Sequence, residues 1–366
     1  MRAASFGMLL VAGAVIGRTS APAPETALTV PLLAECRRNG GSSENSREQH
    51  NGELIRWRAH WSGSGCSIDI RASGDLKFND DFTDIVSVAR GGFVEISEVQ
   101  GTSTRRLTLR LDGGIIERTW TVNGREQAWD DVARRWLADL LIDLDRHSAM
   151  GVDYRFPKIF AQGGANAIIV EAEKMESDYA MSVYLRRLID TQPLTDAEYE
   201  RIVTLASRSI GSDYEMSRIL RSVADRSSLQ SETMRAGYLR AVDRMSSDYE
   251  RSRVLQTILT KASTSHEVGA AAIRTAANLS SDYERSQVLL TAIKNKSLGV
   301  PDVIPILETT VKSKSDYEKA RVMLAVAARW PLDGEARKAY LRAADTIHSD
   351  YENRRVLTAL VNQEPR

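Results

Sequence analysis

The sequence has little of what marks several large classes of protein. Its 366 residues carry 49 basic and 49 acidic side chains. The sequence therefore lacks the basic excess that is typical of a nucleic-acid-binding protein. With only two cysteines, neither a disulfide-rich scaffold nor a multi-cysteine zinc site is expected. The sequence contains no GxSxG, GxGxxG or P-loop motif, and no spacing indicates a catalytic constellation. We therefore expect no enzyme, no cofactor, no metal site and no nucleic-acid partner.

Two segments resemble functional motifs but lack essential residues. His266-Glu267-Val268-Gly269-Ala270 begins like the HExxH helix of zinc peptidases, but Ala270 occupies the position of the second metal-binding histidine. The acidic run Asp80-Asp81-Phe82-Thr83-Asp84 lacks the alternating oxygen ligands and the closing glutamate of a calcium loop. We interpret the first as an ordinary helix start and the second as a solvated turn.

The N-terminal residues 1–25 have the pattern of a secretory signal. Arg2 precedes Ala3–Gly17, an uncharged and mostly apolar run that is shorter than the ~20 residues needed to span a bilayer as a helix. Pro22 and Pro24 follow the best small-residue cleavage positions, so either a cleaved signal peptide or a retained membrane anchor fits. We expect export to the periplasm or cell envelope; the alternative is an apolar leader on a cytoplasmic protein.

Residues 26–51 are predicted to be a disordered linker, because Arg37–His50 contains Gly40-Gly41-Ser42-Ser43 and shows no apolar periodicity. The two cysteines, Cys36 and Cys66, form an even pair that is consistent with one disulfide in an exported protein. Spacing alone does not establish their pairing.

Residues 52–129 are predicted to form an antiparallel β-meander of six or seven strands. Apolar residues alternate with polar ones over Leu54–Trp61 and Cys66–Ala72, which indicates strands that are buried on one face. Glycine-containing turn signals then recur at short intervals, and Asp112-Gly113 and Asn123-Gly124 are strong hairpin signals. A sheet with one apolar face needs a cover.

The predicted cover is the first of two bridging helices over residues 130–163. Within Asp130–Met150 an apolar stripe has helical spacing, and Gly151 is expected to end this helix. A second, shorter helical segment is expected around Tyr154–Gln162. The stripe consists of Val132, Ala133, Trp136, Leu137, Leu140, Leu141 and Leu144.

Residues 164–366 contain six units that share the tripeptide Ser-Asp-Tyr, or SDY. Successive copies are 35, 35, 34, 34 and 34 residues apart, and five of the six continue with glutamate. Ser-x-x-Glu is a capping box, in which the serine oxygen and the glutamate satisfy backbone N–H groups at a helix start. We therefore predict helix caps at Ser177, Ser212, Ser247, Ser281, Ser315 and Ser349, with Glu215, Glu250, Glu284, Glu318 and Glu352 as the reciprocal partners.

Each unit is predicted to be a pair of helices. The fifth, sixth, ninth and tenth residues after each SDY tyrosine are almost all apolar and form one helical face, and the third is small in five copies. The segment before each motif has its own helix starts, such as Thr195-Asp196-Ala197-Glu198 and Thr264-Ser265-His266-Glu267. The expected fold class is α+β multi-domain, with the β-meander followed by a right-handed α-helical solenoid that resembles tetratricopeptide or HEAT repeats.

The SDY tyrosines allow two interpretations. A ladder of tyrosines and aspartates could line a binding groove, or capping and packing could account for the whole motif. We favour the structural interpretation, because six copies do not form the single constellation that catalysis needs. Arg218, Arg253, Arg321 and Arg355, four residues after the tyrosines, are expected to pair with aspartates of adjacent units.

The region of about residues 50–366 resembles a module of poorly characterised bacterial envelope proteins. The similarity rests on Asn79–Ile85, Gly91-Gly92-Phe93, Asn123–Glu126, Arg135–Ala138 and the SDY units. In some relatives this module follows a membrane metallopeptidase domain of the beta-lactam-sensor type, whose helices and HExxH this chain lacks. The resemblance implies an envelope-facing, non-catalytic module.

We therefore expect a scaffold or sensor module that binds another protein or a peptide. One alternative is an enzyme or enzyme subunit with a site between the β-meander and the solenoid, which an apolar pocket with a buried titratable group would support. The other is a structural envelope component that associates with itself.

Overall fold

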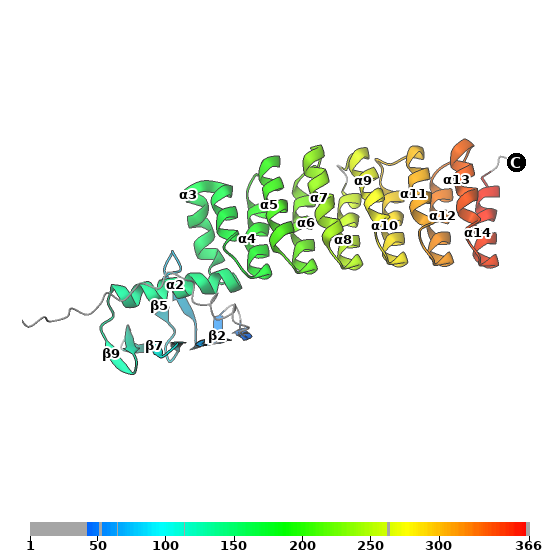
Figure 1. Cartoon of the computed structure of the whole chain (residues 1–366). Helices are drawn as coiled ribbons and strands as arrows, with labels where there is room; N and C mark the ends of the chain where they lie inside the picture. Colours follow the sequence, from blue (N-terminus) through cyan, green and yellow to red (C-terminus); the bar gives the residue numbers. More distant parts are fainter. Residues whose placement is uncertain (1–41, 51–52, 64, 113, 262–263, 364–366) are drawn as a thin grey trace, which may run out of the picture. The chain divides into compact units, whose positions relative to one another are not determined.

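The computed structural model describes residues 42–50, 53–63, 65–112, 114–261 and 264–363 (Figure 1). The predicted leader, the first part of the predicted linker and Cys36 lie outside the described residues. Among those that are described, no helix is both long and apolar enough to cross a membrane.

The first part of the described chain is one seven-stranded antiparallel sheet in the order β1-β2-β3-β6-β7-β8-β9. A hairpin of β4 and β5 is inserted between β3 and β6. The order confirms the predicted meander. The strands are β1 Ser42–His50, β2 Glu53–Gly63, β3 Cys66–Ser73, β4 Leu76–Phe78, β5 Ile85–Val88, β6 Phe93–Gln100, β7 Ser103–Asp112, β8 Ile115–Val122 and β9 Arg125–Gln127.

The strand β1 lies where the sequence predicted the end of a disordered linker. Ser42 to His50 pair along their whole length with β2. The linker prediction is therefore wrong for these residues. Their sequence has no apolar alternation, but a neighbouring strand supplies hydrogen bonds to the backbone whatever the side chains are.

The apolar residues that alternate along the strands lie on the buried face of the sheet, as predicted. Trp57, Ala59 and Trp61 on β2 are buried and lie opposite Ala72, Ile70 and Ile68 on β3. The Asn123-Gly124 turn joins β8 to β9 with positive φ at both residues, as a tight hairpin requires.

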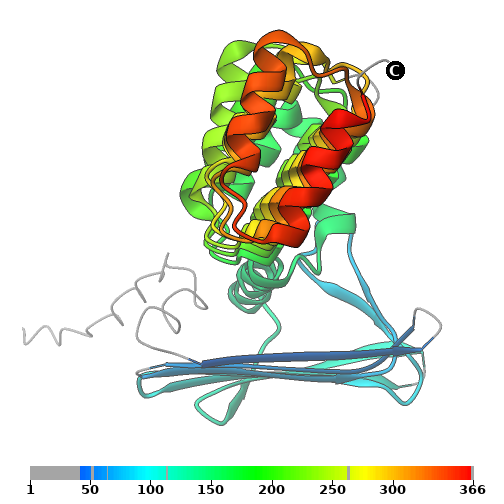
Figure 2. The same cartoon turned by 90° about the vertical axis from the view of Figure 1, so that its right-hand side faces the viewer.

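Helix α2 (Asp131–Ser148) covers this apolar face of the sheet (Figure 2). Every residue of the predicted stripe is buried except Val132, which is 69% exposed. The helix ends at Ser148, and its C-cap is Ala149 in the left-handed conformation rather than Gly151 as predicted. Gly151 instead precedes α3, where a Cβ atom would lie 2.6 Å from the Phe82 ring.

Helix α3 (Val152–Ala172) is longer than the predicted second bridging helix. Its backbone departs from helical geometry at Gly163 and Gly164, so the two halves form separate helical segments. Glycine permits the φ of +59° at Gly164, which few other residues adopt. The predicted boundary at residues 163 and 164 coincides with this break.

The rest of the described chain is the predicted array of paired helices. The helices that begin at the SDY motifs form one layer, in which each helix contacts the next one (Figure 2). The helices that alternate with them along the chain form a second layer. The SDY layer consists of α4 Asp178–Thr191, α6 Asp213–Arg226, α8 Asp248–Thr260, α10 Asp282–Lys294, α12 Asp316–Arg329 and α14 Asp350–Val361. The other layer consists of α5 Asp196–Ser209, α7 Glu232–Arg244, α9 His266–Ala276, α11 Val303–Thr310 with the 3-10 turn Val300–Asp302, and α13 Gly334–Ala344.

The predicted apolar offsets form the core of this array. Leu185, Leu220 and Leu255, the sixth residues after their tyrosines, are fully buried. Burying a leucine side chain contributes about 1.5–3 kcal/mol, so the repeated apolar face is the main source of stability. The small third residues, such as Ser182, Ser217 and Ala320, are also buried and leave room for the neighbouring helix.

Candidate functional site

All six SDY serines cap their helices as predicted. Each side-chain oxygen accepts a hydrogen bond from the backbone N–H three residues later, at 3.3 or 3.4 Å. Ser177 caps α4 in the same way although Ala180 replaces the glutamate, because the donor belongs to the backbone. Such a cap contributes about 0.5–2 kcal/mol to a helix.

The SDY aspartates connect each unit to the next one. The Oδ2 atom of each of the first five accepts hydrogen bonds from two consecutive backbone N–H groups in the following SDY turn, at 2.7–3.1 Å. Burial acts to raise the pKa of Asp282 and Asp316, but these N–H groups outweigh it and lower both. The acceptors are Asp178, Asp213, Asp248, Asp282 and Asp316, and the second donor of each pair belongs to Ser212, Ser247, Ser281, Ser315 or Ser349.

Buried cations reinforce this connection in three units. Arg251, Arg285 and Lys319 lie two residues after their tyrosines and pair with Oδ1 of their own aspartate at 3.2, 2.8 and 3.5 Å. Each also donates to an oxygen atom in the following unit, at 2.7–3.2 Å. Each of these three aspartates therefore contacts the following unit directly through Oδ2. Its Oδ1 atom contacts the same unit indirectly, through the cation that it binds.

The reciprocal half of the predicted capping box is wrong for the SDY motifs. From the second unit on, the serine N–H donates to the aspartate of the preceding unit, so the glutamate is not its acceptor. Three glutamates instead form ion pairs with the arginine three residues later, at 2.7–3.2 Å: Glu215 with Arg218, Glu318 with Arg321 and Glu352 with Arg355. Glu250 is buried like these three, whereas Glu284 is partly exposed.

Of the two predicted boxes in the second layer, one is complete. Thr195 and Glu198 exchange both hydrogen bonds at the start of α5. At the start of α9 the cap is Ser265 rather than Thr264, whose hydroxyl donates to the Ile258 carbonyl instead.

The SDY tyrosines are exposed, which contradicts the interpretation that packing explains them. Between 50% and 69% of each residue is accessible, although the neighbouring apolar positions are buried. They occupy the same position on consecutive helices of one layer, and so form a row along the array. The row consists of Tyr179, Tyr214, Tyr249, Tyr283, Tyr317 and Tyr351.

An arginine side chain lies over four of these six rings. Arg218, Arg253, Arg321 and Arg355 lie over the tyrosine of their own unit, with the guanidinium carbon 5.4–5.7 Å from the ring centre. Arg253 also donates to the Tyr249 hydroxyl at 3.2 Å. The predicted pairing with aspartates of adjacent units is wrong, because those aspartates are occupied by backbone N–H groups. We call the six tyrosines and these four arginines the Tyr–Arg row.

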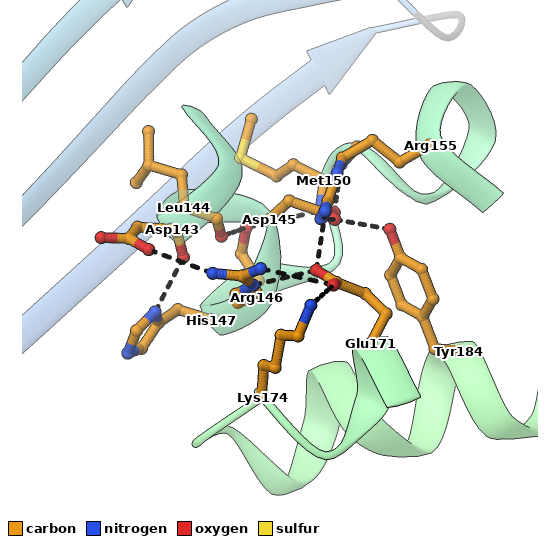
Figure 3. A network of polar contacts seen from close by, with 12 residues as sticks. Asp143, Leu144, Asp145, Arg146, His147, Met150, Arg155, Glu171, Lys174 and Tyr184 are labelled. Carbon is orange, nitrogen blue, oxygen red and sulfur yellow. Dashed lines mark hydrogen bonds and ion pairs between the residues drawn. The ribbon is translucent and has the colours of Figure 1, made fainter. Parts of the chain in front are cut away.

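A buried polar network joins α2, α3 and α4 (Figure 3). Asp145, which is fully buried, accepts hydrogen bonds from the Gly151 N–H at 2.7 Å and, at 2.5 Å each, from Arg155 and the Tyr184 hydroxyl. Arg155 also donates to Glu171 at 2.7 Å. Burial raises the pKa of Tyr184, and the charge of Asp145 adds to this effect.

This network contains the buried titratable groups that the enzyme hypothesis looks for. Its titratable groups are buried, but donors occupy both oxygen atoms of Asp145, and Arg146, Arg155 and Lys174 occupy those of Glu171. Four surface depressions on α3 to α14 are lined by other residues. A saturated network of this kind holds helices together.

The remaining predicted residues occupy structural positions. His266 forms an ion pair with Asp302 at 3.1 Å, and Asp84 pairs with Arg118 at 3.2 Å. Among the described residues, no group of three or more histidine, cysteine or acidic side chains is placed to hold a metal ion. Cys66 begins β3, and its predicted partner Cys36 lies outside the described part of the chain.

No protein-family model, curated protein or solved structure matches this chain. The Tyr–Arg row is therefore the candidate site on its geometry alone. The constant spacing of the tyrosines indicated a ladder, but their exposure depends on how the helices stack.

Proposed function

We propose that this protein is a non-catalytic scaffold that binds another protein or a peptide along the Tyr–Arg row. The observation that carries the proposal is the exposure of all six tyrosines at one repeated position of the SDY helices. The contacts of the exposed rings with arginines contribute only about 0.5–1 kcal/mol each to the stability of the array. Tyrosine and arginine are the residue types that dominate binding energy at protein interfaces.

The geometry of the row suits a long ligand. The tyrosines recur once per unit on helices that contact each other in sequence, so a bound segment meets similar groups at regular intervals. Glu215, Glu318 and Glu352 hold three of the arginines by ion pairs, and the rings lie beneath them. Side chains that are already ordered lose little conformational entropy on binding, which favours affinity.

We place this scaffold in the bacterial cell envelope. The support for this location comes from the apolar run Ala3–Gly17 and from the resemblance to envelope modules described above. Either a cleaved signal or a retained N-terminal anchor is consistent with that role. The location predicts that the tagged protein fractionates with the envelope of its host.

The test is crosslinking of the tagged protein in its native host, followed by identification of the crosslinked proteins. The test variant replaces Tyr214, Tyr249 and Tyr317 with serine. The control replaces three exposed apolar residues outside the SDY helices, Val170, Val311 and Leu341, with serine. Far-ultraviolet circular dichroism verifies that both variants are folded.

We expect one crosslinked partner in the envelope fraction that the tyrosine variant loses and the control retains. Loss of a central interface tyrosine costs about 2 kcal/mol or more, so three replacements abolish stable binding. A partner captured equally by both variants, or crosslinks only between copies of this chain, would contradict the proposal. The second of these results would instead support a self-associating structural component.

A further inference from the structure

The SDY helices of the first three units border a surface depression. It has a volume of about 360 Å³ and lies across α4, α6 and α8. Its lining is almost entirely polar and is dominated by arginine. The charged residues in it are Arg186, Arg218, Arg221, Arg253, Asp190 and Asp225, and Tyr214 of the Tyr–Arg row also contributes.

The four arginines differ in how they are held. Arg218 and Arg253 lie over their tyrosine rings and have hydrogen-bond partners within their own units. Within the described part of the chain, no hydrogen bond or ion pair engages the guanidinium groups of Arg186 and Arg221. The depression therefore combines two fixed arginines with two that are free to bind an acceptor.

The Arg186 guanidinium is partly buried between the helices. Its Nε–H is shielded from solvent and has no hydrogen-bond partner. The Nε–H groups of Arg118, Arg251 and Arg285 are buried in the same way although ion pairs hold those side chains, so the terminal N–H groups of Arg186 are the ones that matter for a ligand. A carboxylate in the depression would accept from the terminal N–H groups of Arg186 and Arg221, which line it and have no hydrogen-bond partner among the described residues.

The sequence of the repeats confines this charge to one end of the array. Arg186 and Arg221 are the seventh residues after their tyrosines, and the same position holds Gln256, Leu290, Leu324 and Thr358 in the later units. Leu290 and Leu324 are partly buried against the core. This position therefore changes from basic in the first two units to apolar in the fourth and fifth.

We propose that this depression binds an acidic, extended segment of a protein partner. The inference rests on the proposed function, because it assigns a ligand class to one part of the Tyr–Arg row. Arginine forks pair with side-chain carboxylates in a bidentate geometry. Asp190 and Asp225 accept hydrogen bonds from the backbone N–H groups that an extended peptide presents, and Tyr214 offers a ring for its side chains.

The lining favours a peptide over a nucleic acid. The lining holds four arginines and two aspartates, and Arg218 is already paired with Glu215, so little positive charge is left for a continuous phosphate backbone. A binder of nucleic acid usually carries a basic stripe along its whole surface, whereas here the two unpaired arginines occur only in the first two units. A peptide with spaced carboxylates matches both the arginines and the aspartates.

The test measures binding of a fluorescein-labelled peptide of alternating glutamate and glycine to the whole chain by fluorescence anisotropy. A peptide with glutamine in place of glutamate is the ligand control, and a polythymidine oligonucleotide of matched charge tests the alternative. The variant is R186Q/R221Q. The matched variant R240Q/R274Q removes two exposed arginines from α7 and α9 in the other layer.

We expect the glutamate peptide to bind, the glutamine peptide not to bind, and R186Q/R221Q to weaken binding about tenfold or more. R240Q/R274Q should change the affinity less than twofold. Equal losses in both variants, or tighter binding of the oligonucleotide than of the peptide, would overturn the inference. If the tyrosine variant still loses its crosslinked partner while R186Q/R221Q binds normally, the proposed function stands and only this inference fails.

Discussion

Replacing Asp248 tests whether the SDY aspartates hold the units together. Asp248 Oδ2 accepts from the N–H groups of Ser280 and Ser281 at 2.8 and 2.7 Å, and Oδ1 pairs with the buried Arg251. Asp248→Ala removes all three bonds. Hydrogen bonds to a charged group contribute about 1.5–3 kcal/mol each, but water reaches the exposed turn and replaces part of this. We therefore expect a loss of about 2–4 kcal/mol in the free energy of unfolding.

The last unit supplies a matched control for this change. Asp350 has the same place at the start of α14, but within the described residues no further SDY turn follows it. Asp350→Ala removes only the interaction of the carboxylate with its own helix, which contributes about 0.3–1 kcal/mol. The difference between the two variants therefore measures the connection between units.

The measurement is urea denaturation followed by far-ultraviolet circular dichroism, together with hydrogen exchange of the Ser280 and Ser281 amides. Exchange is included because repeat arrays do not always unfold in one cooperative step. Faster exchange of these two amides in Asp248→Ala, with little change in Asp350→Ala, is the expected result. Equal destabilisation by both substitutions would refute the reasoning, since the cross-unit bonds would then contribute nothing.

Two further predictions concern the junction of α2, α3 and α4. Burial opposes ionisation of Glu171, but hydrogen bonds from Arg146 and Arg155 outweigh it and lower its pKa from 4.5 to about 2. The unfolded chain therefore takes up this proton first, and stability that is complete above pH 4.5 should be lost as the pH falls toward 2. Urea denaturation at a series of pH values should show that the free energy of unfolding falls less steeply with decreasing pH in Glu171→Gln than in the unaltered protein. An unchanged slope would contradict the lowered pKa of Glu171. Gly151→Ala should lower the free energy of unfolding by about 1–3 kcal/mol in thermal denaturation, because its Cβ would meet the Phe82 ring at 2.6 Å. Gly211→Ala is the control and should lower it clearly less, because its Cβ would have its nearest contact at 3.7 Å.

The structure divides the SDY motif among three roles. Serine acts within its own helix, aspartate acts between units, and tyrosine faces solvent. The first unit adds a fourth feature, because Tyr184 stands where later units have isoleucine or valine, and its hydroxyl bonds to Asp145 on α2. This side chain joins the array to the helix that covers the sheet.

The sequence by itself determined the features that depend on local rules. The serine caps, the apolar offsets and the period-two strands follow from backbone geometry within a few residues, and the structure confirms them. The repeat spacing likewise predicted the number and order of the helix pairs. None of these features requires knowledge of how one unit contacts the next.

Only the tertiary structure decided which groups meet across units. The acceptor of the Ser212 N–H is Asp178, 34 residues earlier, and not the nearby glutamate that the capping pattern predicted. Strand β1 has no side-chain pattern and is ordered by pairing with β2. Tyr249 is exposed, and Arg186 meets Arg221 in one depression, because stacking turns the same face of each SDY helix outward. The angle and separation between neighbouring helices set that face, and no local pattern encodes them.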